Sequence, residues 1–296
     1  MPHLPVLLKE IVQCLDPQPN ENFIDCTFGQ GGHTLAILEK NGPKGKVLGI
    51  EADPKILTNT KYKIQDTKYK NRLVLVNDNF ANLEKIVTKE KFINISGVLM
   101  DLGISSWHLE ESKRGFSFMK DEPLLMRLDA KTQETAKEIV NYWPEQLLVK
   151  MLQDYGQERF ARRIAKAICL SRKAKPIEST FQMVKIIKSA VPKNYERGRL
   201  HPATRTFLAL RLTVNKELEN LEKILPQALK VLERNGKLAV ISFNSLEDRL
   251  VKTFFKEEAR QGNIKVISKK PITPGWPEIT ANPRARSAKL RVAVKN

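Results

Sequence analysis

The residues best suited to chemistry are a cluster of glycines and the carboxylates that follow it. Segment 23–34 reads Phe-Ile-Asp-Cys-Thr-Phe-Gly-Gln-Gly-Gly-His-Thr, so three glycines lie between an apolar run and a helical pattern. Glycine permits positive φ and has no Cβ, which lets the main chain approach a bound molecule closely. Glu51 and Asp53 end a second apolar run, about 20 residues after Gly29. At this spacing a carboxylate meets ribose hydroxyls, so the pattern predicts a nucleoside-containing cofactor.

Two cofactor classes use loops of this kind. The pattern here is Gly-x-Gly-Gly, and Thr34 stands where a dinucleotide fingerprint has its third glycine. A pyrophosphate favours a bare helix N-terminus, whereas Asp25 suits the cationic sulfonium and zwitterionic tail of S-adenosylmethionine. The pattern therefore favours S-adenosylmethionine over NAD. A tight turn that binds no ligand is the remaining alternative.

The charge balance indicates a polyanionic partner. Among 296 residues, 51 Lys and Arg outnumber 33 Asp and Glu, which gives a formal net charge of +18. Long-range attraction and counterion release make such an excess typical of proteins that bind nucleic acid. Basic character that serves only solubility is the alternative.

Cysteine usage and the first residues indicate the compartment. Cys14, Cys26 and Cys169 lie far apart in apolar surroundings, so the sequence suggests neither a disulfide framework nor a metal site. The N-terminus lacks a signal-peptide pattern, and no apolar run approaches the roughly 20 residues that span a bilayer. We therefore expect a cytoplasmic protein without membrane attachment.

Strand-length apolar runs position these residues. In the first third of the chain they alternate with helical patterns, which predicts a parallel α/β sheet. Ligands of such sheets lie beyond the carboxyl ends of the strands, where Asp25, Asp53, Phe80 and Asp101 fall. Phe80 either stacks on an adenine or caps the core. Seven strands are expected, one from Phe23 and the others at 47–50, 73–76, 97–100, 237–243, 264–267 and 289–294.

The alternation stops in the middle of the chain. Between 104 and 203 only a polar loop and helical patterns occur, with helices expected at 135–143, 157–168 and 181–191. A long helical region, 204–234, follows and should end at Asn235-Gly236. We expect a first core part at 1–103, an inserted helical domain for substrate recognition at 104–203, and a second core part at 204–296.

Seven dense segments carry a resemblance to a known family. In this order along the chain, they resemble the bacterial small-subunit ribosomal RNA cytosine-N4 methyltransferase family, of the RsmH or MraW type, from end to end. The segments are Pro5–Leu8, Asp25–His33, Asp101–Ser106, Arg114–Phe118, His201–Thr206, Val240–Arg249 and Ala281–Leu290.

The resemblance implies a fold and an activity. The fold would be a Rossmann-like class I S-adenosylmethionine-dependent methyltransferase with a seven-stranded α/β sheet and an inserted helical domain. The reaction would be N4-methylation of a cytosine in the decoding centre, the P-site region, of 16S rRNA in the small ribosomal subunit. A homodimer is left open.

Carried over motif by motif, the resemblance implies a set of site residues. Asp101 would hold the cofactor, accept an N4 hydrogen of the cytosine as the catalytic group, or do both. We expect RNA phosphates to be bound by a basic set of six residues, with ordinary solvated charges as the alternative; the set is Arg159, Arg162, Arg163, Lys166, Arg284 and Arg286. The cofactor residues would be Gly31, Gly32, His33, Asp53, Phe80, Asp101 and His108.

Some positions depart from the family pattern. Trp107-His108 stands where the family has Pro-Gln, Leu125 replaces an acid, and Asn244 replaces a histidine. These departures keep open a non-catalytic RNA-binding ribosome assembly factor with a methyltransferase-like core. The sequence has neither the His-x-Glu and Pro-Cys-x-x-Cys of a zinc base deaminase nor the Pro-Pro-aromatic motif of DNA amino-methyltransferases.

Overall fold

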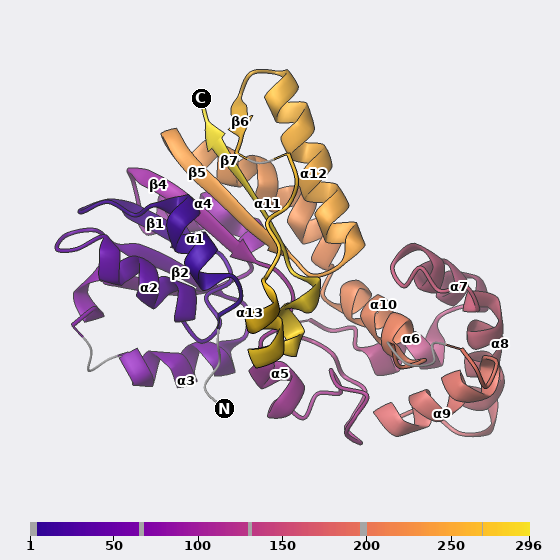
Figure 1. The fold of residues 1–296 in the computed structure, drawn as a ribbon. Coiled ribbons are helices and arrows are strands. Elements are labelled where there is room, and N and C mark those ends of the chain that lie inside the picture. The colour runs from indigo at the N-terminus through magenta and orange to yellow at the C-terminus, as the bar shows by residue number, and fades with distance from the viewer. Residues whose placement is uncertain (1–4, 65–67, 130–131, 196–199, 268) are drawn as a thin grey trace. The chain divides into compact units, whose positions relative to one another are not determined.

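The chain folds into two compact units (Figure 1). The computed structural model describes residues 5–64, 68–129, 132–195, 200–267 and 269–296. One unit, here called the sheet unit, comprises Met1–Gly103 and Leu218–Asn296; the other, the helical unit, comprises Ile104–Glu217.

The sheet unit is built on a seven-stranded sheet with the order β3-β2-β1-β4-β5-β7-β6. Neighbouring strands run parallel except at β7, which is antiparallel to both β5 and β6. Chain order reverses between β1 and β4, and ligands of doubly wound sheets bind at such a switch point. The expected seven strands are confirmed: β1 (Asn22–Asp25), β2 (Val47–Glu51), β3 (Leu73–Asn77), β4 (Ile95–Asp101), β5 (Leu232–Ser242), β6 (Ile264–Val266) and β7 (Lys289–Lys295).

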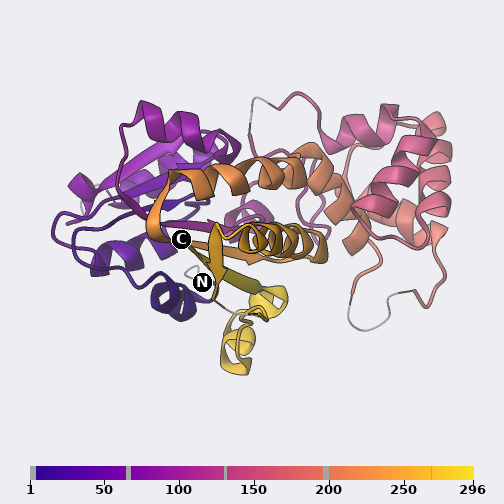
Figure 2. The ribbon, with the colours of Figure 1, turned by 90° about the horizontal axis from the view of Figure 1, so that it is seen from above.

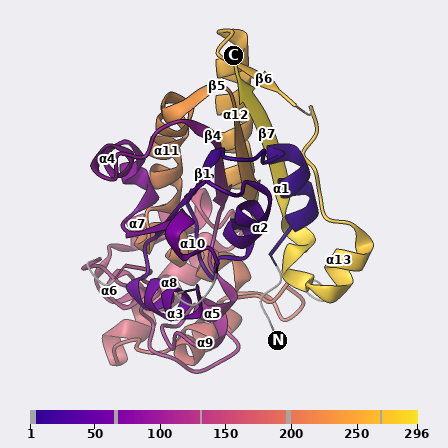
Figure 3. The ribbon, with the colours of Figure 1, turned by 90° about the vertical axis from the view of Figure 1, so that its left-hand side faces the viewer.

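Helices cover both faces of this sheet because strand residues are apolar on both sides. One hydrophobic cluster joins the sheet to α4 (Leu83–Lys89), α11 (Glu217–Val231) and α12 (Ser245–Arg260). The other joins it to α1 (Leu8–Leu15), α2 (Gly32–Lys40) and the 3₁₀ helix η3 (Pro283–Ser287). Figure 3 shows α4 and α11 on one side of the sheet and α1 and α2 on the other.

The remaining helices of the sheet unit lie in connections between strands. They are α3 (Pro54–Ile64), α13 (Trp276–Ala281) and the 3₁₀ helices η1 (Lys70–Arg72) and η2 (Phe80–Asn82). Figures 2 and 3 show α13 and η3, in yellow, projecting from the sheet unit on the side of α1.

The helical unit contains α5 to α10. Its described residues form no strand and have one isolated β-bridge, between Pro123 and Ser179. Its core is one apolar cluster to which all six helices contribute. The helices are α5 (Ser106–Glu110), α6 (Ala136–Tyr142), α7 (Glu145–Asp154), α8 (Ala161–Ala174), α9 (Thr180–Ala190) and α10 (Thr204–Val214).

Two helix limits differ from expectation. The helix expected at 157–168 begins only at Ala161, because the buried Glu158 carboxylate accepts the Phe160 N–H at 2.8 Å and the Tyr195 hydroxyl at 2.8 Å. The helical region expected at 204–234 is broken after Val214. There the Asn215 amide donates to the Met126 carbonyl at 2.8 Å, and Lys216 has φ 49°.

This break also moves the second unit boundary. The boundary expected at 203 lies at Glu217, because Phe207, Leu210 and Val214 of α10 are part of the helical unit's core.

The expected helix end at Asn235-Gly236 is wrong for a related reason. The helix α11 ends at Val231, and Asn235-Gly236 lies within β5. Leu232 pairs with Ile95, and the register then shifts before Lys237 pairs with Gly97. The Asn-Gly turn signal therefore marks a bulge in a strand, where Asn235 has φ 65°.

Candidate active site

The glycine loop after β1 has the backbone conformation that its sequence predicts. Gly29 and Gly31 have φ values of 53° and 78°, a region that other residues rarely occupy. The Gly29 N–H donates to Glu51 Oε2 at 2.9 Å, and the Thr60 hydroxyl donates to the Gly29 carbonyl at 3.1 Å. Strand β2 and helix α3 therefore hold the loop.

Glu51 ties this loop to the acidic end of β2. Its second oxygen, Oε1, accepts the Asp53 N–H at 2.8 Å. Burial raises the pKa of Glu51 to about 7, with the charges of Asp53 and Asp25 adding to the effect and the two hydrogen bonds opposing it.

Asp25 connects β1, the loop and α2. Its Oδ2 accepts the Thr34 hydroxyl at 2.7 Å, and its Oδ1 accepts the Thr27 N–H at 3.1 Å. Thr27 Oγ1 in turn accepts the Asp101 N–H at 2.6 Å, which joins the ends of β1 and β4. Burial raises the pKa of Asp25, against the opposing effects of His33 and these hydrogen bonds. The sequence analysis assigned no role to Thr27 or Thr34, since isolated threonines carry no signal.

Asp101 and His33 face each other at the centre of the site. His33 Nδ1 lies 3.8 Å from Asp101 Oδ2, and His33 Nε2 lies 2.9 Å from the Val6 carbonyl oxygen. A carbonyl only accepts, so Nε2 carries a proton, and Nδ1 is the ring atom that faces Asp101. The residues expected here, Gly31, Gly32, His33 and Asp101, are thus brought together.

The two carboxylate oxygens of Asp101 differ in their surroundings. Its Oδ1 is buried and makes no hydrogen bond within the part of the chain that the structure describes. Buried polar atoms are nearly always paired, so an orphaned acceptor at the end of β4 marks a place for a ligand donor. Burial raises the pKa of Asp101 to about 6, the charge of Asp25 adds to this, and His33 opposes it.

Two further buried atoms, at the carboxyl end of β5 beside β4, have no hydrogen-bond partner among the residues that the structure describes. They are Ser242 Oγ and Asn244 Nδ2. The Asn244 side chain begins α12, because its Oδ1 accepts the N–H groups of Leu246 and Glu247, each at 3.0 Å. Asn244, which departs from the family's histidine, therefore serves as the cap of α12.

Asp53 and Phe80 follow β2 and β3. Asp53 is fully buried, and its Oδ1 accepts the Lys55 N–H at 2.9 Å at the start of α3. Phe80 begins η2 and packs, partly buried, against the cluster of α4 and α11. Both residues have structural contacts, and their contacts with a cofactor stay predictions.

The departures near 107 and 125 lie in the helical unit. His108 is buried, its Nδ1 accepts the Ser105 N–H at 3.2 Å, and its ring lies edge-on to Phe116 at 5.2 Å. Leu125 donates its N–H to the Arg114 carbonyl at 3.2 Å. His108 thus closes the first turn of α5, and its assignment as a cofactor residue stays a prediction.

The basic set is divided between the two units. All six side chains are exposed. Four of them lie on α8 or just before it, where the guanidinium of Arg159 lies 5.5 Å from the Tyr195 ring and that of Arg163 lies 5.5 Å from the Phe160 ring. Arg284 and Arg286 lie on η3 of the sheet unit. Their exposure suits phosphate contacts.

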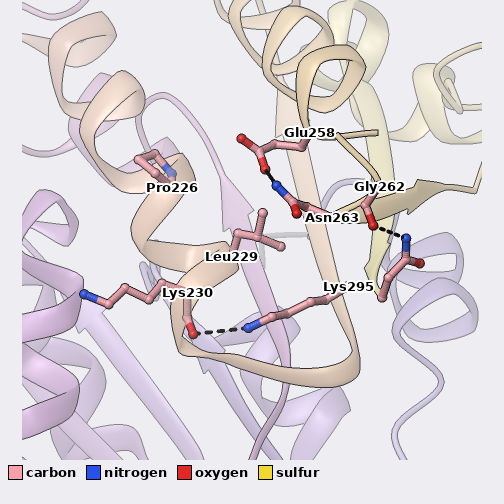
Figure 4. A pocket seen from close by; sticks show the side chains of 8 residues that line it. Pro226, Leu229, Lys230, Glu258, Gly262, Asn263 and Lys295 are labelled. Carbon is pink, nitrogen blue, oxygen red and sulfur yellow. Dashed lines mark hydrogen bonds between the residues drawn. The ribbon is translucent and has the colours of Figure 1, made fainter. Parts of the chain in front are cut away.

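A separate pocket of about 330 Å³ lies at the other edge of the sheet (Figure 4). Lys230 comes at the end of α11, Asn263 just before β6, and Lys295 at the end of β7, so the pocket lies at the amino ends of the parallel strands. The Lys295 ammonium donates to the Leu232 carbonyl at 2.6 Å, and the Asn263 amide donates to Glu258 at 2.7 Å. The pocket therefore lies at the opposite end of the parallel strands from the glycine loop.

The described residues lack two kinds of feature. They contain no group of three His, Cys, Asp or Glu side chains arranged to hold a metal ion. None of their helices is both long and apolar enough to cross a membrane.

The electrostatics of the loop distinguish the two cofactor classes. Asp25, Glu51 and Asp101 surround it, and burial raises the pKa of each. A pyrophosphate at this place would add negative charge to a buried acidic cluster, whereas a cation would relieve it. The sheet also has one antiparallel strand, β7, beside β5. The acidic glycine loop and this sheet together define a class I S-adenosylmethionine-dependent methyltransferase.

Comparison with known proteins gives the family. The MraW methylase family matches residues 1–296, and the chain belongs to it. Ribosomal RNA small subunit methyltransferase H of Heliobacterium modesticaldum is 43% identical over 309 residues, which cover 99% of this chain and 98% of that protein. The protein of the same name from Persephonella marina is 43% identical and covers 98% of both chains. Among solved structures, an rRNA methylase from Streptococcus thermophilus aligns over 99% of this chain and 97% of its own at 10% identity, with a TM-score of 0.46.

Proposed function

We propose that this protein is a cytoplasmic enzyme that methylates N4 of a cytosine in the decoding centre of 16S rRNA, with S-adenosylmethionine as the methyl donor. The orphaned, buried Oδ1 of Asp101 at the carboxyl end of β4 is the observation that carries this proposal. Family membership and relatives named as small-subunit rRNA methyltransferases support it.

The residues present fit the cofactor. Gly31 allows close approach of the main chain, and Asp25 and Glu51 provide negative charge for a cationic ligand. Asp53, Phe80 and His108 are proposed to complete the binding site. When bound, S-adenosylmethionine supplies an electrophilic methyl group on a sulfonium.

Asp101 is proposed to act on the nucleophile. The lone pair of a cytosine amine is conjugated with the ring, so the nitrogen must pyramidalise as it attacks. A carboxylate that accepts one N4 hydrogen favours this geometry and holds the base at near-attack distance. The base must leave its stack to reach such a buried acceptor.

The basic set is proposed to bind the rRNA backbone. Exposed Arg and Lys side chains contact phosphates without reading bases, so they would give affinity while the buried polar atoms at the ends of β4 and β5 select the base. Helix α8 and η3 would therefore be the RNA-contacting elements.

Transfer of a labelled methyl group tests the function. The purified protein is incubated with labelled S-adenosylmethionine and small subunits from cells that lack the modification, and the product nucleoside is identified by mass spectrometry. N4-methylcytidine at the decoding centre is expected. Binding to the subunits without any transfer would instead support the assembly factor.

A further inference from the structure

Three consecutive residues at the start of the chain each contact a different part of the sheet unit. Pro5 lies against the glycine loop so closely that a Cβ on Gly32 would be 2.3 Å from Pro5 Cγ. Val6 provides the carbonyl that accepts His33 Nε2–H. Leu7 donates its N–H to Glu278 Oε1 of α13 at 2.7 Å. We call Pro5–Leu7 the lead-in.

Leu7 shows that this arrangement is imposed by its surroundings. It is fully buried and has φ 53° and ψ 34°, the left-handed conformation that bulky residues rarely adopt. Such a conformation persists only where neighbouring contacts determine it, and it concentrates near functional sites. The hydrogen bond that this N–H donates to the Glu278 carboxylate is the polar contact that holds it.

The lead-in in turn orients His33. Its Nε2–H donates to Val6, which sets the plane of the ring, and its Nδ1 then faces Asp101 Oδ2 at 3.8 Å. A shift of the lead-in would therefore move both the ring and the loop residue Gly32, which Pro5 contacts. Asp101 is the group to which the proposed function assigns the N4 hydrogen.

We propose that Glu278 is a positioning residue for methyl transfer, which acts by holding the lead-in so that His33 and the glycine loop keep Asp101 and the cofactor in reactive geometry. The proposal rests on the proposed function. It assigns Glu278 no contact with the reacting atoms.

Three variants test it. Glu278→Ala removes the acceptor, Glu278→Gln keeps an oxygen at the same place, and Glu21→Ala is the matched control, because Glu21 Oε2 accepts the Gln18 N–H at 2.8 Å elsewhere on the sheet unit. Misplacement of reacting groups by about 1 Å can cost 100-fold in rate, so kcat should fall about 10- to 100-fold in Glu278→Ala with little change in KM. Glu278→Gln should recover most of kcat, and Glu21→Ala should match the wild type.

A second readout does not depend on activity. The NMR signal of the His33 Nε2 proton, assigned with His33→Gln, should shift and exchange faster with water in Glu278→Ala but not in Glu21→Ala. This readout stands even where the wild type transfers no methyl group, so failure of the function and failure of this inference are distinguishable.

Unchanged kcat together with an unchanged His33 signal in Glu278→Ala would overturn the proposal. Equal losses in Glu278→Gln and Glu278→Ala, with an unmoved His33 signal, would also overturn it and leave Glu278 a structural residue. Glu278→Asp shortens the side chain by one methylene and so moves the acceptor away from the Leu7 N–H. Where the alanine variant does not fold, this variant should show the same fall in kcat and the same change in the His33 signal.

Discussion

Asp101→Asn should separate the chemistry of the site from its stability. The substitution keeps the shape of the side chain and an acceptor oxygen but removes the charge. We expect near-normal affinity for S-adenosylmethionine and transfer slowed by about 10²-fold or more, the size of a lost positioned proton acceptor. This corresponds to at least about 2.7 kcal/mol of transition-state stabilisation.

The same substitution should stabilise the fold. Burial raises the pKa of Asp101 to about 6, so the folded protein binds this proton more tightly than the unfolded chain does. The stability that this tighter proton binding adds to the fold is fully present below the unfolded pKa of about 3.9, and it is lost as pH rises through about 6. At pH 7.5 the wild type therefore carries a destabilising carboxylate. Removing the charge should raise the free energy of unfolding by on the order of 1 to 3 kcal/mol.

Three measurements check this prediction. Single-turnover transfer gives the rate, calorimetric titration gives cofactor affinity, and urea unfolding at pH 7.5 gives stability. The wild-type rate should also fall about tenfold per pH unit below pH 6, because the acceptor must be ionised, while the variant should show no such fall.

Two results would refute the reasoning. A fall in cofactor affinity that matches the fall in rate would make Asp101 a binding residue and leave the chemistry to positioning alone. A variant less stable than the wild type would show that the charged carboxylate is stabilised in the fold, which contradicts its raised pKa.

Three further predictions follow from the structure. Asp53→Ala should weaken S-adenosylmethionine binding by about 1.5 to 3 kcal/mol in calorimetry. Asp53→Asn keeps an oxygen that can accept the Lys55 N–H, so it separates the loss of the charge from the loss of this hydrogen bond. Binding of NAD in place of S-adenosylmethionine would contradict the assignment. Neutralising one residue of the basic set should reduce the slope of log affinity against log salt by somewhat less than one, and unchanged slopes across six single variants would make them solvated surface. Asp248→Asn should cost about 3 kcal/mol of unfolding free energy, because Asp248 binds the buried Arg291 at 2.7 Å. Burial raises the pKa of Asp248, but hydrogen bonds from Arg291 and Lys289 outweigh it and hold the pKa below its usual value. The difference between wild type and variant should therefore begin to shrink below the unfolded pKa of about 4 and disappear as pH falls through the lower pKa of the folded state.

Local patterns were sufficient for the sheet and the loop. Each strand is an apolar run with turn formers at its ends, and the glycine conformations at 29 and 31 are those that only glycine adopts readily. Carboxylates that follow parallel strands must meet at one edge of the sheet. The sequence pattern alone therefore places Asp25, Glu51, Asp53 and Asp101 at the carboxyl ends of the strands.

Element limits depended on distant contacts. Asn215 ends α10 because its amide bonds to Met126, which is 89 residues away in the chain. Asn235-Gly236 reads locally as a helix end, yet the pairing of Leu232 with Ile95 draws it into β5. In both cases a tertiary hydrogen bond or strand pairing overrides a local propensity worth about 1 kcal/mol.

The sequence by itself thus determined the strands, the glycine loop and which acids stand at the sheet's carboxyl edge, because these follow from short periodicities and from the chemistry of single residues. Only the tertiary structure decided which atoms have partners. Among the described residues it leaves Asp101 Oδ1 unpaired, turns His33 Nε2 toward Val6, and brings Glu278 to Leu7 across 271 positions of the chain. Such contacts depend on how whole elements pack, and no spacing in the sequence encodes them.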